Sequence, residues 1–517
     1  MGFSIPAILE QWVKDRPDAP ALTLDDQTLS WRQLDERAAA VAGALRADGI
    51  GKGDRVAFLD KNGLTYFEVL FGAARLGAVD VAVNWRLAPP EMAFIVNDSG
   101  ATVLVVHSEF AEQLAAFAPT LTNVRHIVVV GDEAAPHTAY EQWLAGAKPV
   151  TSAEPVGDHD VALQLYTSGT TGLPKGAMLD NGNFSGLLDM AGQLEMGDDA
   201  VNLAAMPMFH IGGSGWALFG MSLGVHTVLL RELDPAELLA LIPRHGVTHA
   251  FLVPAALLFL TLTPGVEDVD YSSLVALCYG ASPISEALLE RCQRLFGCGF
   301  YQVYGLTETT GAITMLTPQD HTDTAHRERL RSAGRPMQGV EIRCVDLLSG
   351  ADVPDGQVGE VWIRSHQNMA GYWRQPEASA AVRGPDGWLR TGDAGYLVEG
   401  YLFLHDRVKD MIVSGGENVY PAEVENALAK HPSVADVAVI GVPSATWGEE
   451  VKAMVVAAPG ENVDTTALIA FARGQLAGFK VPKSIDVVEA LPRNPSGKIL
   501  KKDLRAPYWA GRERQIS

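Results

Sequence analysis

Short β-branched and apolar runs alternate with stretches of helical composition along this chain, and no other feature limits its fold as strongly. Buried strands are predicted from the runs at residues 55–59, 103–106, 127–130, 161–166 and 275–279. Residues 34–45 are rich in Ala and Leu, which predicts a helix between the early strands. Alternation of this kind is typical of α/β layers with largely parallel sheets, so we predict the α/β fold class.

The pattern changes near residue 400, which indicates a second and smaller domain. Pro421 suits the first position of a helix, and His431 with Pro432 would end it. Strands at residues 401–404, 434–440, 453–457 and 485–488 and a helix at 465–476 complete the predicted unit. We predict a large N-terminal domain of layered α/β sheets, residues 1–407, and a small C-terminal α/β domain, residues 408–517.

Charge and composition exclude several classes of function. The 517 residues include 40 Lys plus Arg and 62 Asp plus Glu, and the net charge of −22 argues against a nucleic-acid or anionic-membrane partner. The four cysteines form no CxxC pair, so neither a disulfide framework nor a zinc site is predicted. The longest apolar stretch, residues 250–262, contains Pro254 and is shorter than the ~20 residues that span a bilayer. With no targeting signal in view, we expect a cytoplasmic protein without a membrane span.

A loop of glycines and hydroxyl residues follows the predicted strand at 161–166. Residues 166–176 read YTSGTTGLPKG, and small residues, hydroxyls and one lysine are what a loop needs to bind a polyphosphate. It is not a Walker loop, because Pro174 stands where that pattern has its second glycine and Gly176 replaces the Ser or Thr after Lys175. Composition alone leaves a phosphate loop and a plain glycine-rich hairpin equally open.

Five motifs in a fixed order resolve this ambiguity: residues 166–175, 304–309 (YGLTET), 391–393 (TGD), 406–417 and 494–498 (NPSGK). Over nearly its whole length the chain resembles the acyl- and aryl-CoA synthetases of the adenylate-forming superfamily, which also holds the luciferases and the peptide-synthetase adenylation domains. The resemblance implies an enzyme that uses ATP and Mg²⁺ to convert a carboxylic acid into an acyl-adenylate with release of pyrophosphate. Coenzyme A would then displace AMP.

The resemblance also assigns the nucleotide site. The β- and γ-phosphates would be held by Thr167, Ser168, Gly169, Thr170, Thr171, Gly172 and Lys175. The adenosine would be held by Tyr304, Gly305, Gly280, Ala281 and Ser282 at the base and by Asp393 and Arg407 at the ribose. Thr307 would contact the α-phosphate, Glu308 would ligate Mg²⁺, and Lys498 would bridge the substrate carboxylate and the α-phosphate.

In this family the small domain also rotates between the two half-reactions. The junction residue is here Lys409, a hinge at a single position. After rotation, CoA would contact Ser414, Gly415, Gly416, Trp447 and Phe479, although either aromatic ring could equally belong to the core. Around Lys498, the basic residues Arg493, Lys501, Lys502 and Arg505 face only Asp503 in the sequence, which predicts a cationic surface.

The acyl group is expected beside His210, Gly212, Gly213, Ser214 and Trp216. His210 completes the predicted catalytic set of Lys175, Thr307, Glu308 and Lys498, as a gate rather than a general base, because a carboxylate is already ionised at neutral pH. Amino-acid-activating relatives carry an aspartate after the phenylalanine of this motif. Here His210 follows Phe209, which disfavours a free amino acid as substrate. The small glycines would either leave room for a bulky group or only let the backbone turn.

The leading hypothesis is therefore an ATP-dependent acyl-CoA ligase for medium- or long-chain fatty acids. The alternatives are an aryl or phenylpropanoid CoA ligase, a stand-alone adenylating enzyme that loads a carrier protein, and a non-catalytic binding protein on the same fold. A pure binder would have no need of Lys175, Glu308, Asp393 and Lys498 together. The expected partners are small molecules, and a homodimer is compatible with the sequence. Apolar pockets discriminate weakly between chain lengths, so the acid stays open.

Overall fold

The structure, a computed structural model, describes residues 3–132, 135–167, 173–347, 349–407, 410–414, 417–444, 446–493 and 499–510. Its contacts divide the chain into two compact units. One contains Met1–Glu341 and Arg364–Leu389, and the other contains Ile342–Ile363 and Arg390–Ser517. Both are built from helices and sheets, so the predicted α/β class is confirmed.

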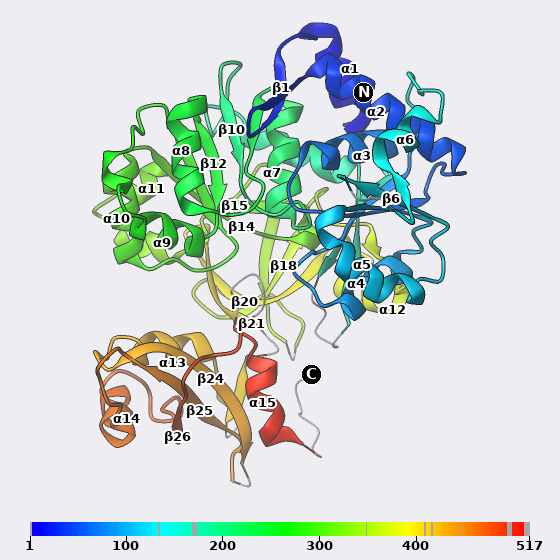
Figure 1. Ribbon diagram of the computed structural model, residues 1–517. Helices are drawn as coiled ribbons and strands as arrows, with labels where there is room; N and C mark the ends of the chain where they lie inside the picture. The colour runs from blue at the N-terminus through cyan, green and yellow to red at the C-terminus, as the bar shows by residue number, and fades with distance from the viewer. Residues whose placement is uncertain are drawn as a thin grey trace. The chain divides into compact units, whose positions relative to one another are not determined.

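The first unit contains two large sheets. The described strands of one sheet run in the order β16 (Arg335–Pro336), β15 (Gly311–Leu316), β14 (Gly299–Leu306), β13 (Ala276–Gly280), β12 (His249–Leu252), β10 (Val201–Ala204), β11 (His226–Leu229), β1 (Pro20–Leu24) and β2 (Gln27–Ser30). The strands from β14 to β1 pair in parallel, and the edges are antiparallel. Helices α8 (Pro235–His245), α9 (Pro254–Leu262), α10 (Glu286–Phe296) and α11 (Pro318–Thr322) gather along one side of this sheet, in green in Figure 1.

The described strands of the second sheet run in the order β19 (Gly371–Tyr372), β9 (Lys175–Asp180), β8 (Val161–Thr167), β4 (Val79–Ala82), β3 (Arg55–Leu59), β5 (Val103–His107), β6 (His126–Val130) and β7 (Thr138–Ala139). The strands from β8 to β7 pair in parallel, whereas β9 and β19 are antiparallel. Met92 and Phe117, on α4 (Pro89–Ser99) and α5 (Ala111–Phe117), pack with Leu104 of β5 in the core of this layer.

The remaining helices of the first unit are α1 (Ile5–Asp15), α2 (Trp31–Ala47), α3 (Leu64–Arg75), α6 (Tyr140–Ala145), α7 (Ile211–Ser222) and α12 (Pro376–Val382), with short 3₁₀ turns such as η1 (Ser108–Phe110), η3 (Gly182–Met190) and η5 (Thr307–Thr309). The start of α2 illustrates how the local sequence sets these bounds. The Ser30 hydroxyl accepts a hydrogen bond from Gln33 N, and the Gln33 side chain accepts one from Ser30 N, which forms a capping box.

The second unit also contains two sheets. The first has strands β17 (Glu341–Val345), β18 (Gly359–Arg364), β20 (Leu389–Val398) and β21 (Tyr401–Arg407), and the second has β23 (Glu417–Val419), β22 (Ile412–Ser414), β25 (Gly448–Ala457), β24 (Val434–Ser444) and β26 (Ser484–Val487). Helices α13 (Pro421–Leu428) and α14 (Thr465–Arg473) pack on the second sheet through Val424, Leu428 and Leu468, while α15 (Lys501–Trp509) packs on the other face through Leu504 and Tyr508.

Each run predicted as a strand overlaps a strand of the structure: the ends of the run at 55–59 agree with β3, and the ends of the other runs differ by at most five residues. The helix predicted at 465–476 ends earlier, at Arg473. The contact division also differs from the predicted domain limits, because β17, β18, β20 and β21 pair with one another and group with the C-terminal strands. The domains 1–407 and 408–517 stay a prediction. Among the described helices, none has both the length and the apolar character that a bilayer crossing requires.

Candidate active site

The hairpin of β8 and β9 sets two of the predicted phosphate-binding residues side by side. Thr167 and Lys175 are register partners in this antiparallel pair. Glu308 reaches the same place from η5, which follows β14: its Oε1 lies 3.5 Å from Thr167 Oγ1. The hydroxyl of Tyr372 donates to the same oxygen at 2.8 Å, and Lys175 Nζ lies 5.2 Å from the centroid of the Tyr372 ring. A hydroxyl, an ammonium group and a carboxylate from three separate segments thus converge.

The turn that carries Thr307 and Glu308 depends on a close approach of β14 and β15. A Cβ at Gly305 would lie 1.7 Å from Gly311 O, so only glycine fits beside the bulge after Tyr304. Thr309 Oγ1 then accepts a hydrogen bond from Leu306 N at 2.8 Å, which closes η5. The local sequence therefore fixes the backbone of the turn that carries Glu308, and Thr307 lies partly buried beside it.

The predicted adenine contacts lie at the carboxyl ends of the adjacent parallel strands β13 and β14. Gly280 is paired with Val303, and a Cβ at Gly280 would lie 2.2 Å from Val303 O. Ala281, with φ of +66°, and Ser282 are exposed directly after β13, and Tyr304 is partly buried on β14. The structure thus brings these residues to one edge of the sheet. A ligand crevice commonly forms at such an edge of an α/β sheet.

His210 caps the start of α7 and is half-buried. Its ring lies 4.5 Å from the Phe209 ring, which in turn meets Trp85 edge-on at 6.3 Å. Burial, with a smaller contribution from the positive charge of Arg86, lowers the pKa of His210 to about 4. The ring is therefore neutral at physiological pH, and its role as a gate stays a prediction.

The two adjacent glycines after His210 differ in their neighbours: Gly213 faces backbone atoms, whereas Gly212 faces the side chain of Phe251. A Cβ at Gly213 would lie 2.1 Å from Pro207 O, and one at Gly212 would lie 2.9 Å from Phe251 Cε1. Ser214 is fully buried and donates to His210 O at 3.2 Å. Trp216 is 7% exposed and donates from Nε1 to Leu203 O at 3.1 Å. These contacts belong to the packed interior, and contact of Ser214 or Trp216 with an acyl group stays a prediction.

Four predicted site residues are described in the second unit. Asp393 is 8% exposed on β20, and its N–H donates to Thr391 Oγ1 at 3.0 Å. Ser414 is 5% exposed on β22. Trp447 and Phe479 are 50% and 37% exposed, so the alternative that they are core aromatics is wrong. Their contact with CoA stays a prediction.

The cationic surface predicted around Lys498 is largely neutralised. Arg493 pairs with Asp436 at 2.5 Å, Lys501 with Glu425 at 2.9 Å and Arg505 with Asp410 at 2.7 Å. The sequence suggested an excess of positive charge because these acidic partners lie far away along the chain. Tertiary contacts brought them together.

Several predicted residues lie outside the described part of the chain: Ser168, Gly169, Thr170, Thr171, Gly172, Lys409, Gly415, Gly416 and Lys498. The side chain of Arg407 also lies outside it, although the Arg407 backbone pairs with Asp393 in the register of β20 and β21. The roles predicted for all of these residues stay predictions.

Two surface cavities lie away from the residues predicted to bind nucleotide or acid. One, of about 510 Å³, is lined by residues such as Asp180, His366 and Arg383, and the other, of about 210 Å³, by residues such as Lys52 and Arg55. Both are open to solvent and carry charged side chains, and neither has Glu308 or Lys175 in its lining.

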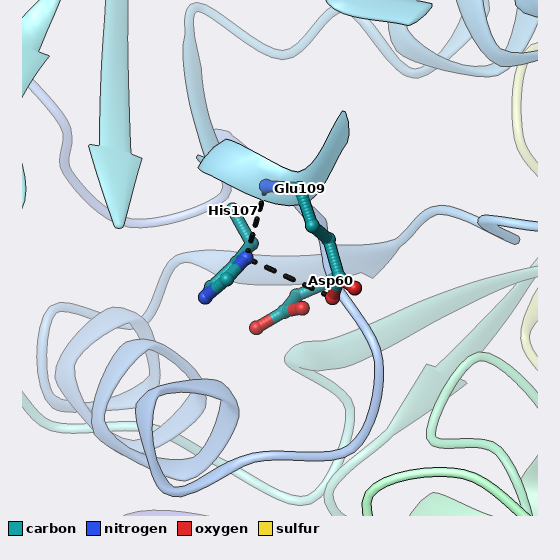
Figure 2. Close-up of side chains that lie close together, drawn as sticks. All are labelled: Asp60, His107 and Glu109. Atoms are coloured by element: carbon teal, nitrogen blue, oxygen red, sulfur yellow. Dashed lines mark hydrogen bonds and ion pairs between the residues drawn. The ribbon is translucent and has the colours of Figure 1, made fainter. Parts of the chain in front are cut away.

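Figure 2 shows a second cluster, in which Asp60, His107 and Glu109 point toward one another at the carboxyl ends of β3 and β5. Their ligand atoms lie within 4.8 Å, a spacing that suits a metal ion. However, Arg231 Nη2 pairs with both carboxylates, at 2.8 Å from Asp60, and Glu109 N donates to His107 Nδ1 at 3.2 Å. Because a guanidinium already supplies the positive charge, this cluster is an ion-pair network rather than a metal centre.

Sequence reasoning missed Tyr372, which touches two predicted catalytic residues, and Arg86, which acts on His210. Neither lies in the five motifs. A tyrosine on a two-residue edge strand has no periodic signal, so only the tertiary structure places it at this site.

Comparison with known proteins adds independent support. The model of the AMP-binding enzyme family matches residues 9–373, and that of the AMP-binding enzyme C-terminal domain matches residues 423–498. The chain is 41% identical to the fatty acid–[acyl-carrier-protein] ligase ScoC of Streptomyces coeruleorubidus, across 97% of this chain and 96% of the relative. It is 40% identical to a feruloyl-CoA synthase of an Amycolatopsis species, across 95% and 96%. The crystal structure of ATP-bound MatB from Rhodopseudomonas palustris superposes with a TM-score of 0.88 at 29% identity, across 98% and 99%.

The fold, the converging charged groups and these matches together define an adenylate-forming enzyme. The chain belongs to the AMP-binding enzyme family. It is an AMP-forming acid–thiol ligase, and ligases of this kind use ATP, Mg²⁺ and coenzyme A.

Proposed function

We propose that this ligase activates a medium- or long-chain fatty acid, or a similar apolar carboxylic acid, as acyl-AMP and then transfers the acyl group to CoA. The meeting of Thr167, Lys175 and Glu308 carries this proposal, because an adenylating site must neutralise phosphate charge and hold a divalent cation. Lys175 supplies positive charge, the Thr167 hydroxyl donates, and Glu308 offers the carboxylate oxygens that Mg²⁺ prefers.

The residues present fit a nucleotide with its metal. Gly280 keeps the edge of β13 and β14 free of a side chain that would strike Val303 O, and the exposed Ala281 and Ser282 follow it. When bound, Mg²⁺ would withdraw charge from the phosphate oxygens. Lys175 would hold the β- and γ-phosphates, Thr307 the α-phosphate and Asp393 the ribose hydroxyls, which a carboxylate accepts well.

Lys498 is proposed to orient the substrate carboxylate against the α-phosphate. The carboxylate oxygen would attack phosphorus, the bond from phosphorus to the bridging oxygen of pyrophosphate would break, and the electron pair would leave with pyrophosphate. A thiolate would then attack the acyl carbon and expel AMP. No proton needs to leave the acid, which is ionised at neutral pH, so a neutral His210 is no obstacle.

The surroundings of His210 support an apolar acid. The imidazole is uncharged, its neighbour is the ring of Phe209, and the ring of Phe209 in turn contacts Trp85. No carboxylate stands after Phe209 to pair with the ammonium group of an amino acid. Aromatic walls also suit an aryl or phenylpropanoid acid, which we keep as the second candidate, and the names of the two relatives cover both kinds of substrate.

A carboxylate-dependent exchange of pyrophosphate into ATP tests the proposal. The panel should contain fatty acids of increasing chain length, cinnamic-type acids and free amino acids, ranked by kcat/KM. We expect exchange with the longer fatty acids, rising by several-fold for each buried CH₂ at ~0.8 kcal/mol until the pocket is filled. Exchange only with aromatic acids would select the second candidate, and silence with every acid would overturn the proposal.

A second measurement identifies the thiol acceptor. Thioester formation from the preferred acid should be compared with free CoA and with an acyl-carrier protein bearing phosphopantetheine. We expect CoA to be used at the higher kcat/KM. Preference for the carrier protein would instead favour a stand-alone loading enzyme. A homodimer stays a prediction, and light scattering of the purified protein would test it.

A further inference from the structure

The short segment around β19 connects the two parts of the nucleotide site. Met369 N donates to Glu308 O at 2.8 Å, which ties the start of the segment to η5. Ala370 N donates to Met178 O at 2.9 Å and Trp373 N donates to Gly176 O at 2.8 Å, which tie its remainder to β9. The strand that begins with Lys175 and the turn that carries Glu308 are therefore held by one strap of backbone, residues 369–373.

Tyr372 extends this connection from the backbone to the side chains. Only 8% of the residue is exposed, and its N–H donates to Ser379 Oγ at 2.8 Å, so its position is fixed. The hydroxyl donates to Glu308 Oε1 at 2.8 Å, while the ring lies against Lys175 Nζ at 5.2 Å. One side chain thus contacts both the carboxylate and the ammonium group of the site.

The two contacts have different physical effects. Thr167 and Tyr372 both donate to Oε1 of Glu308, so within the described part of the chain Oε2 keeps its lone pairs for a cation. A hydroxyl that fixes one oxygen orients the carboxylate before the metal arrives, which saves ordering entropy. The ring face attracts the ammonium group of Lys175 and limits where it can rest.

We propose that Tyr372 is a positioning residue for metal-bound ATP: its hydroxyl aims Glu308 at the cation, and its ring aims Lys175 at the phosphates. This inference rests on the proposed function, in which Glu308 ligates the metal and Lys175 binds phosphate. It makes the two effects separable, because Tyr372→Phe removes only the hydroxyl, whereas Tyr372→Leu removes the hydroxyl and the aromatic ring.

Tyr301→Phe is the matched control. Tyr301 lies on β14, is 7% exposed, and donates its hydroxyl to Gln193 O at 2.7 Å, so this variant loses a comparable buried hydrogen bond away from Glu308. Three readouts compare the full-length proteins: binding of Mn²⁺ in the presence of ATP by electron paramagnetic resonance, binding of ATP without metal by calorimetry, and the midpoint of thermal unfolding.

We expect Tyr372→Phe to weaken Mn²⁺ binding about tenfold, the scale at which partners of a metal ligand act, and to leave metal-free ATP binding unchanged. Tyr372→Leu should weaken both Mn²⁺ binding and metal-free ATP binding. Tyr301→Phe should change neither, with a midpoint of unfolding similar to that of Tyr372→Phe. Across the variants, a larger Mn²⁺ dissociation constant should be accompanied by a higher Mg²⁺ concentration for half-maximal pyrophosphate exchange.

Equal Mn²⁺ affinity in Tyr372→Phe and Tyr301→Phe would overturn the inference while wild-type exchange remains, because the hydroxyl would then have only a structural role. A wild-type protein that binds no ATP at all would instead overturn the proposed function. The two failures are distinguishable since nucleotide binding is measured without any acid substrate.

Discussion

At the scale of single residues, burial sets the charge state of groups that look ordinary in the sequence. His210 would be a mixture of neutral and charged forms near neutral pH if it were exposed. Half-buried against Phe209 and close to Arg86, it keeps its neutral form, with the pKa lowered to about 4. At the acyl site proposed for His210, an uncharged ring would neither attract the carboxylate nor compete for it with Lys498, the residue proposed to orient it.

This charge state is directly testable. We expect the ring signal of His210, assigned in a spectrum of ring-labelled protein by its loss in His210→Asn, to stay unchanged from pH 8 to pH 5.5. Between about pH 4 and 6.5 the unfolded state binds the extra proton, so this residue favours unfolding as the pH falls. A His210 signal that titrates near pH 6.5 would contradict the assignment of a neutral gate.

Asp80 is the opposite case, a carboxylic acid in the core of the second sheet. It is fully buried on β4, its Oδ2 accepts a hydrogen bond from the Tyr66 hydroxyl at 3.3 Å, and Oδ1 has no hydrogen-bond partner among the described residues. Burial raises its pKa to about 7, only partly opposed by Tyr66. The folded state therefore holds a proton that the unfolded state releases near pH 4, and stability falls as the pH rises from about 4 to about 7.

We expect Asp80→Asn to stabilise the protein more at pH 8 than at pH 5, by about 3 kcal/mol in the difference, because the amide carries no charge to desolvate. Urea unfolding midpoints of wild type and variant at both pH values measure this. Tyr66→Phe should steepen the pH dependence of stability in the wild-type background and have no such effect in the Asp80→Asn background, where no carboxylate is left to titrate. A stabilisation that is equal at the two pH values would refute the buried titration.

Among the elements, the ion-pair network of Arg231 with Asp60 and Glu109, two residues that Figure 2 shows, joins the two large sheets of the first unit. Asp60 and Glu109 follow β3 and β5 of one sheet, and Arg231 lies just beyond β11 of the other. Asn62 extends the junction, since its Nδ2 donates to Met206 O and Leu230 O. The loop that leads to His210 is therefore fastened to both layers.

Removal of Arg231 should weaken this junction. The Asp60 side chain is 3% exposed, and burial already raises its pKa against the pull of Arg231. Arg231→Met keeps the aliphatic stem and leaves the carboxylate without its charged partner, so we expect a loss of about 3 kcal/mol in unfolding free energy. Arg244→Met is the control, because Arg244 and Glu237 form a largely exposed pair at 3.0 Å that should contribute less than ~1 kcal/mol. Similar losses in both variants would show that the junction is no stronger than a surface pair.

For the whole molecule, variants of Lys498 and of the predicted hinge Lys409 should each impair a different half-reaction. Lys498→Ala is expected to reduce pyrophosphate exchange at least a hundredfold, because a charge at the transferring phosphoryl group is lost. Reaction of preformed acyl-adenylate with CoA should fall far less. Lys502→Ala removes a neighbouring exposed charge as the control. Equal loss in both half-reactions would contradict a lysine that serves adenylation only.

Lys409→Pro should have the reverse effect, since proline fixes φ at the predicted hinge and opposes rotation. We expect adenylation to be retained and thioester formation to be lost, measured as acyl-AMP that accumulates after CoA is added. Lys409→Ala removes the same side chain without restricting φ and separates the two effects. Thioester formation at the wild-type rate in Lys409→Pro would place the hinge at another residue.

Much of this protein could be predicted from its sequence. The strands at 55–59 and 103–106 and the helix at Pro421 are local features, fixed by apolar runs, β-branched residues and caps, and they appear where expected. The glycines and hydroxyls before Lys175 and the motif around Glu308 are also contiguous, because phosphate groups and metals are bound by short loops with set spacing.

Which groups act on one another depends on contacts between distant parts of the chain. The tertiary structure set Tyr372 between Glu308 and Lys175, neutralised the basic residues near the C-terminus with distant acids, and lowered the pKa of His210 by burial. Contacts of this kind join residues from separate strands, and their energy depends on burial and distance in space. A linear sequence specifies spacing along the chain, so it determined the helices, the strands and the chemistry of the loops. Folding determined the charge state of His210 and the contact partners of Tyr372 and the basic residues.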